Sequence, residues 1–123
     1  MDDKRRRRIS GRVGAAIERE RMRAGLTQET LAEKLGVGPQ AVSRIERGVV
    51  HAPVWRLVEV SEVVGCTLAQ LVGDASDAPI DQLHSLADVL DGLTSDDRAY
   101  VVNQAIQAAT HLRRRGAGTK RRG

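Results

Sequence analysis

Four polar side chains recur at helical spacing within residues 39–47. If this segment is helical, Gln40, Ser43, Arg44 and Arg47 share one face, and the apolar residues of the segment lie on the other. Glutamine and arginine can each form two hydrogen bonds with a base edge in the major groove of DNA, and serine discriminates more weakly. The face has donors and acceptors but no apolar anchor. This pattern is typical of a helix that reads bases.

The residues before this segment predict a second short helix and a tight turn. Leu31, Ala32 and Leu35 recur at helical spacing. Gly36 suits the left-handed residue that ends a helix, and Pro39 suits the first position of the next one. We therefore expect helices over residues 28–35 and 39–47, joined by a corner.

Residues 27–48, TQETLAEKLGVGPQAVSRIERG, resemble the helix-turn-helix family of phage repressor and Cro proteins, also called the XRE type. The similarity extends upstream through IERERMRAGLTQ and downstream through GVVHAPVWRLVEVSEVVGCTLAQLV, so it covers roughly residues 9–73. The resemblance implies an all-α, five-helix DNA-binding domain. The second helix of its motif would lie in the major groove.

The resemblance also implies roles for individual residues. An arginine late in the first helix would pair with an acid near the end of the recognition helix, and the amide of Gln28 would meet a phosphate at a helix start. The alternative for each polar residue is a solvated side chain. The implied base contacts are Pro39, Gln40, Ser43 and Arg44, the phosphate contacts are Gln28, Arg47 and His51, and the ion pair is Arg21 with Glu46.

Composition narrows the class of protein. Apolar residues make up 41% and charged residues 29% of the chain, as in soluble globular proteins. Aromatics make up only 2%, which argues against a stacking platform for single-stranded nucleic acid. The single cysteine, Cys66, fits a reducing cytoplasm, where we expect the protein to lie on the nucleoid. No apolar run approaches the roughly 18 residues of a membrane span, so no membrane partner is expected.

Catalytic and ligand-binding patterns are missing from the sequence. His51, His84 and His111 lie far apart, and Cys66 has no second cysteine with which to bind a metal. No glycine loop for phosphate and no nucleophile elbow is found. We therefore expect neither an enzyme nor a cofactor, and no residue pattern marks a ligand pocket.

Charge divides the chain into regions. Residues 1–8 contain five bases and two acids without apolar periodicity, which predicts a disordered arm. Such an arm either lies on phosphates or in a minor groove, or is a solvated tail. Residues 74–112 contain seven acids and one base, and residues 113–123 contain six bases and predict a second disordered tail.

Between these regions, residues 9–73 form the expected DNA-binding domain. Its first helix is expected from about Ser10, as the N-cap, to Arg23. A fourth helix is expected over residues 54–64, with Trp55 in the core, and a short fifth helix after Thr67. Cys66 is expected to pack as a small buried hydrophobe.

The C-terminal part predicts a linker, residues 74–78, and a helical hairpin over residues 79–112. One apolar stripe runs from Ile80 to Leu90 and another from Val102 to Leu112. Two such helices cannot bury both stripes alone. By analogy with tails in the family, we expect residues 79–112 to form a homodimer, although the tail could fold back on its own domain instead.

Together these features predict a regulator that binds double-stranded DNA sequence-specifically. We expect a transcriptional repressor that binds a palindromic operator as a dimer. The alternative is an antitoxin whose C-terminal part binds a toxin while the motif binds its own promoter. A third hypothesis is an adaptor that bridges proteins without binding DNA.

Overall fold

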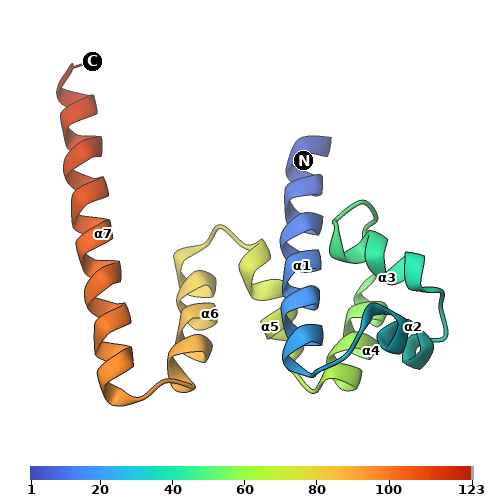
Figure 1. The fold of residues 1–123 in the computed structure, drawn as a ribbon. Helices are drawn as coiled ribbons and strands as arrows, with labels where there is room; N and C mark the ends of the chain where they lie inside the picture. Colours follow the sequence, from blue (N-terminus) through green and yellow to red (C-terminus); the bar gives the residue numbers. More distant parts are fainter. Residues whose placement is uncertain (123) are drawn as a thin grey trace. The chain divides into compact units, whose positions relative to one another are not determined.

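The computed structural model describes the backbone of residues 1–122 and the side chains of residues 1–117. These residues form α-helices and one 3-10 helix, with no strand among them, which confirms the all-α fold (Figure 1). The elements are α1 (Asp3–Arg23), α2 (Gln28–Leu35), α3 (Pro39–Glu46), α4 (Val54–Val64), α5 (Leu68–Val72), η1 (Gly73–Ala75), α6 (Pro79–Asp91) and α7 (Ser95–Arg122).

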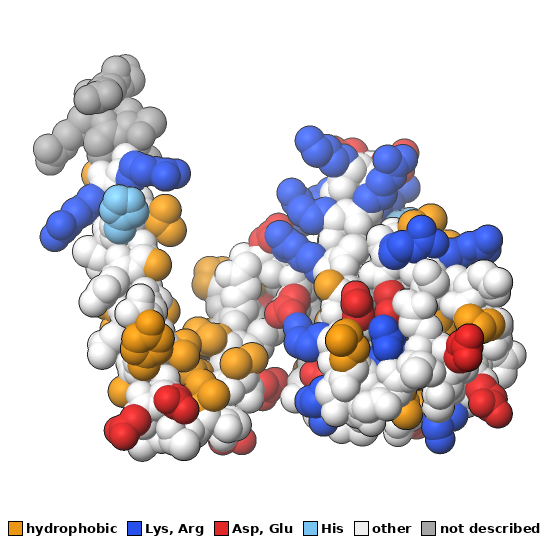
Figure 2. Space-filling view, viewed as in Figure 1, with side chains coloured by type: hydrophobic (Ala, Val, Ile, Leu, Met, Phe, Trp, Pro, Cys, Tyr) orange, Lys and Arg blue, Asp and Glu red, His pale blue; other side chains and the backbone are white. Residues whose placement is uncertain are grey.

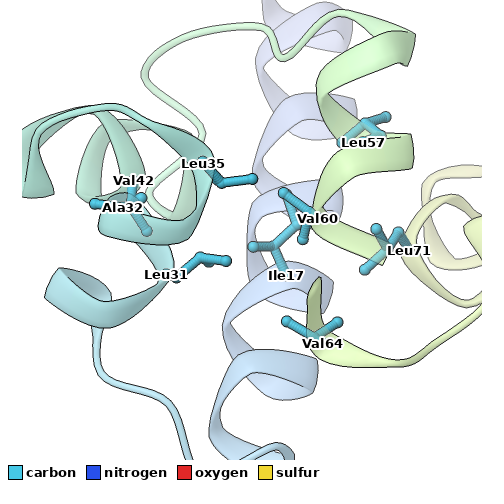
Figure 3. Packing of buried hydrophobic residues seen from close by; sticks show 9 residues of the cluster. All are labelled: Ile17, Leu31, Ala32, Leu35, Val42, Leu57, Val60, Val64 and Leu71. Atoms are coloured by element: carbon cyan, nitrogen blue, oxygen red, sulfur yellow. The ribbon is translucent and has the colours of Figure 1, made fainter. Parts of the chain in front are cut away.

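The chain forms two compact units, Met1–Ser85 and Leu86–Gly123, which we call unit 1 and unit 2. Unit 1 contains α1 to α5, η1 and the first part of α6, and α1 to α5 surround an aliphatic core (Figure 3). Each fully buried Ile, Leu or Val stabilises the fold by roughly 1.5–3 kcal/mol. The buried core residues are Ile17, Leu31, Ala32, Leu35, Val42, Leu57, Val60, Val64 and Leu71.

Local signals set the ends of α2 and α4, and both helices coincide with the predicted ranges. The hydroxyl of Thr27 accepts a hydrogen bond from the backbone N–H of Thr30 at 3.0 Å. Gly36 ends α2 at φ 73°, and Gly65 ends α4 at φ 76°. Both glycines are left-handed, a conformation that other residues adopt only with strain.

The N-terminal prediction was wrong: residues 3–8 are not disordered but form the first turns of α1. Asp2, not Ser10, caps the helix, and its carboxylate accepts a hydrogen bond from the backbone N–H of Arg5 at 2.8 Å. Adding turns to an existing helix requires no new nucleation, and Lys and Arg are good helix formers. Asp3 in the first turn also complements the helix dipole.

The second basic end is likewise helical, because α7 continues to Arg122. The predicted disordered tail, residues 113–123, is therefore wrong for residues 113–122, and residue 123 lies outside the described residues. The physical reason is again helix propagation. The basic run extends a helix that begins at Ser95, and this extension requires no new nucleation.

Trp55 is also placed differently from the prediction. Its side chain is 60% exposed, and the guanidinium carbon of Arg56 lies 4.6 Å from the centre of its ring. The buried positions of α4 begin at Leu57, and Trp55 lies two residues earlier, roughly 200° around the helix. Cys66 is half-buried against the core, and this burial raises the pKa of its thiol.

Residues 74–78, predicted as a linker, lie against α1. The guanidinium of Arg19 pairs with the carboxylate of Asp74 at 2.9 Å, and that of Arg12 pairs with Asp77 at 2.8 Å. These hydrogen-bonded ion pairs lower the pKa of both carboxyl groups.

The apolar stripes of α6 and α7 remain open to solvent in the single chain. No side chain of α6 is buried. In the described part of α7, Ile106 is 58% exposed, and Tyr100, Val102 and Leu112 are also exposed. None of the helices in the described residues is long and apolar enough to cross a membrane.

Candidate nucleic-acid interface

The outer face of α3 and its C-cap residue, Arg47, carry the four polar residues expected to share one face. Gln40, Arg44 and Arg47 are exposed, and Ser43 is half-buried. Val42 and Glu46, on the other side of the helix, are buried. Because the inner face is occupied by the core, the polar face is the one that a duplex could meet.

Gly14 of α1 allows α3 to pack closely against this helix. A Cβ on Gly14 would overlap the carbonyl oxygens of Ile45 and Glu46 and would lie 2.8 Å from the carbonyl carbon of Glu46. These backbone atoms cannot turn aside as a flexible side chain would. The close contact therefore sets the depth at which α3 lies on α1.

The predicted ion pair holds the C-terminal end of α3. The Nε of Arg21 donates to Glu46 at 2.6 Å, and its Nη2 donates to the second carboxylate oxygen at 3.0 Å. The side chains are only 10% and 2% exposed. The hydrogen bond to Glu46 raises the pKa of Arg21 against the opposing effect of burial. Arg21 also donates to the carbonyl oxygen of Leu26 at 2.8 Å.

Gln28 joins this cluster, a contact that the sequence did not reveal. Its amide nitrogen donates to Glu46 at 2.9 Å, so Glu46 accepts from two side chains at once. The amide retains a second N–H, and Gln28 stands at the first position of α2. Gln28 thus links the start of α2 to the end of α3, and its phosphate contact stays a prediction.

The loop after α3 is attached to α1 by a side-chain hydrogen bond. Ser10 Oγ is hydrogen-bonded to Nδ1 of His51, so Nε2 is the ring nitrogen with which this exposed histidine would meet a phosphate. Gly48, at φ 72°, lies directly on the backbone of Gly11. The expected phosphate contact of His51 would therefore come from a loop that α1 holds in place.

Basic side chains gather on the same side of unit 1. Figure 2 shows Lys and Arg side chains around the N-terminal end of α1 and over α3. Residues 4–8 are all basic and all exposed. This charge lies on a helix and not on a flexible arm, so it has a defined position beside the loop.

Other chemistry is not supported by these side chains. Among the described residues, no group of three or more His, Cys, Asp or Glu side chains could hold a metal ion. The arrangement has a solvent-facing polar helix, a buried ion pair behind it and a basic rim. These features define a helix-turn-helix DNA-binding domain.

Comparisons with known proteins agree with this class. The helix-turn-helix family profile matches residues 17–71. One crystal structure of the clp gene regulator ClgR from C. glutamicum is 30% identical, with a TM-score of 0.52, over 55% of this chain and 87% of that one. A second ClgR crystal structure, from Corynebacterium glutamicum, is 28% identical, with a TM-score of 0.53, over 68% of this chain and 86% of that one. No curated protein sequence gave a significant match. The chain belongs to the XRE-type helix-turn-helix family of DNA-binding regulators.

Proposed function

We propose that this protein represses transcription by binding a near-palindromic operator as a homodimer. The observation that carries the proposal is the exposed polar face of α3, held from behind by Gly14 and by the Arg21–Glu46 pair. A helix fixed in this way can hold its polar side chains at constant positions in the major groove. The similarity to ClgR, a regulator of clp genes, supports a role in transcription.

Within this proposal, each polar residue has a distinct task. Gln40 suits adenine and Arg44 suits guanine, each through two hydrogen bonds. Pro39 and Ser43 meet bases through smaller contacts. Gln28, Arg47 and His51 bind phosphates, joined by the basic N-terminal turns of α1.

The exposed apolar stripes of α6 and α7 support dimerisation. A second copy would cover the same patch on each subunit, as two-fold symmetry requires. Two linked domains would then place their recognition helices about one turn of DNA apart. The acidic charge of residues 74–112 keeps this part away from phosphate.

The same exposed stripes also suit the second candidate function, an antitoxin. In that case a toxin, and not a second copy, would cover α6 and α7. A full-length protein that is monomeric at micromolar concentration would favour this candidate.

Footprinting on genomic fragments, followed by anisotropy titrations on the protected site, tests the proposal. Arg44→Ala and Gln40→Ala should each weaken binding to the operator by about 1–3 kcal/mol and hardly change binding to random duplex. Arg47→Ala serves as the contrast, because a residue that binds phosphate should contribute equally on both duplexes. Absence of any protected site would contradict the proposal.

A further inference from the structure

A pocket of about 380 Å³ opens between α1, the loop after α3, and the segment that follows α5. It lies within unit 1. Its volume falls in the range of small-molecule sites, which are usually apolar with a few polar groups. The aliphatic walls come from five parts of the chain and include Ile9, Val13, Ile45, Val50, Leu57 and Val72.

The polar groups of the pocket are few and carry positive charge or hydrogen-bond donors. Ser10 and His51 line it as a hydrogen-bonded pair. Arg6 lines the pocket too. Among the residues with described side chains, its guanidinium has two exposed partners, the carbonyl oxygen of Met1 at 2.9 Å and the carboxylate of Asp3 at 3.3 Å. Exposed ion pairs contribute little free energy, so the guanidinium of Arg6 can exchange these partners for a ligand.

We propose that this pocket binds an aliphatic carboxylate and that the bound molecule weakens the contact with DNA. Aliphatic walls without aromatic rings favour an alkyl chain over a planar ring. Arg6 suits the carboxylate, because charge-assisted hydrogen bonds to guanidinium are strong. The neighbouring bases, all of residues 4–8, would repel a cationic ligand.

Binding in the pocket is coupled to DNA binding because some of the pocket walls belong to the proposed DNA interface. Ile45 belongs to α3, and Val50 and His51 belong to the loop beside it. Gly14 and Gly48 lie directly against neighbouring backbone atoms. A ligand that displaces the pocket walls would therefore also displace α3 and the loop beside it. The carboxylate also cancels part of the positive charge offered to phosphates. This second half of the inference depends on the proposed DNA binding, whereas the binding of the carboxylate does not.

Calorimetry on the full chain without DNA tests the site, with octanoate as the probe. Octanoate should bind more tightly than neutral octanol, and octylammonium should bind most weakly. Arg6→Gln should remove the preference of octanoate over octanol, whereas Arg7→Gln, whose side chain is outside the pocket lining, should keep it. Equal affinity for all three probes would overturn the proposal.

Two matched pairs of variants separate this pocket from the apolar faces of α6 and α7. Val50→Glu places a carboxylate at the pocket and should abolish octanoate binding, whereas Val49→Glu, one residue away and outside the lining, should not. Ala75→Leu should fill the pocket, with exposed Ala69→Leu as its control. Equal octanoate affinity within both pairs would place the probe elsewhere. If Val50→Glu abolished self-association of the protein instead of octanoate binding, a second copy of the chain would occupy the pocket.

Anisotropy on the operator then measures the coupling. Saturating octanoate should weaken DNA binding about 5-fold or more, and saturating DNA should weaken octanoate binding by the same factor. If octanoate binds at the pocket and DNA affinity stays constant, the coupling is wrong. The proposed repressor function would be untouched, since operator binding is measured without octanoate.

Discussion

Gly48, just beyond the recognition helix α3, lies directly against Gly11 of α1: a Cβ on Gly48 would lie 2.7 Å from the backbone nitrogen of Gly11. Three residues further along α1, Gly14 makes the same kind of approach to the end of α3. At these two glycines the backbone of α1 lies against the segment that is proposed to read DNA. Substitutions of the glycines at this contact should therefore change the free energy of unfolding according to the free space around each Cβ.

Gly14→Ala should destabilise the fold by about 1–3 kcal/mol, because its Cβ would overlap carbonyl groups of α3. Gly11→Ala is the matched control: a Cβ there meets nothing within 4 Å, and alanine favours a helix over glycine by about 0.5–1 kcal/mol. Urea denaturation compares the two free energies of unfolding. Similar values for both variants would rule out the close contact.

Glu46→Ala should destabilise the fold by about 3–5 kcal/mol, because it leaves the guanidinium of Arg21 buried without its partner. It also removes the acceptor of the Gln28 amide. The double variant Arg21→Met/Glu46→Leu should recover much of this stability, since apolar side chains need no partner.

Glu59→Ala serves as the control for this ion pair. Its pair with Arg56 is more exposed and should contribute less than about 1 kcal/mol. Thermal unfolding measures all these variants. An unchanged melting temperature in Glu46→Ala would contradict a stabilising role for the buried pair.

Replacing Lys4, Arg5, Arg7 and Arg8 with glutamine should flatten the salt dependence of DNA binding. Each phosphate that the protein no longer neutralises removes about 0.9 from the slope of log K against log salt concentration, so contacts from about half of the four side chains correspond to a fall of about two. Arg6 is kept because it lines the pocket. Circular dichroism should show that helicity is retained, and an unchanged slope would mean that these side chains are only solvated.

Ile106→Glu should weaken the proposed dimer, because it buries a charge in the apolar patch that a second copy would cover. Gln107→Glu, at the adjacent exposed position of α7, is the control and should leave the association unchanged. Sedimentation velocity measures both. If the two variants associate equally, residues 79–112 do not dimerise through this stripe.

Local sequence determined the helices that carry the motif. Thr27, Gly36, Pro39 and Gly65 act through hydrogen bonds and backbone conformations within a few residues, so α2 and α4 were predicted to the residue and α3 to within one. The polar face of α3 was predictable for the same reason, since helical spacing alone decides which residues share a face.

The N-terminal turns show where a local pattern misleads. A run of five bases predicts disorder when it is considered alone, but residues 3–8 are joined to a helix that Ile17 anchors in the core. Cooperative propagation and the Asp2 cap then outweigh the repulsion between like charges. For Trp55, hydrophobicity predicts the core, whereas the helical spacing of α4 predicts the side away from Leu57, and the structure agrees with the spacing.

Apart from the pair of Arg21 with Glu46, which the family resemblance implied, only the tertiary structure decided which distant residues meet. Gln28 meets Glu46, Ser10 meets His51, and the aliphatic pocket is lined by side chains from several elements. These contacts depend on how deeply α3 lies on α1, which is set by the absence of a side chain at Gly14. Sequence spacing encodes the period of a helix, whereas the crossing of two helices is decided by the packing of atoms that are far apart in the chain.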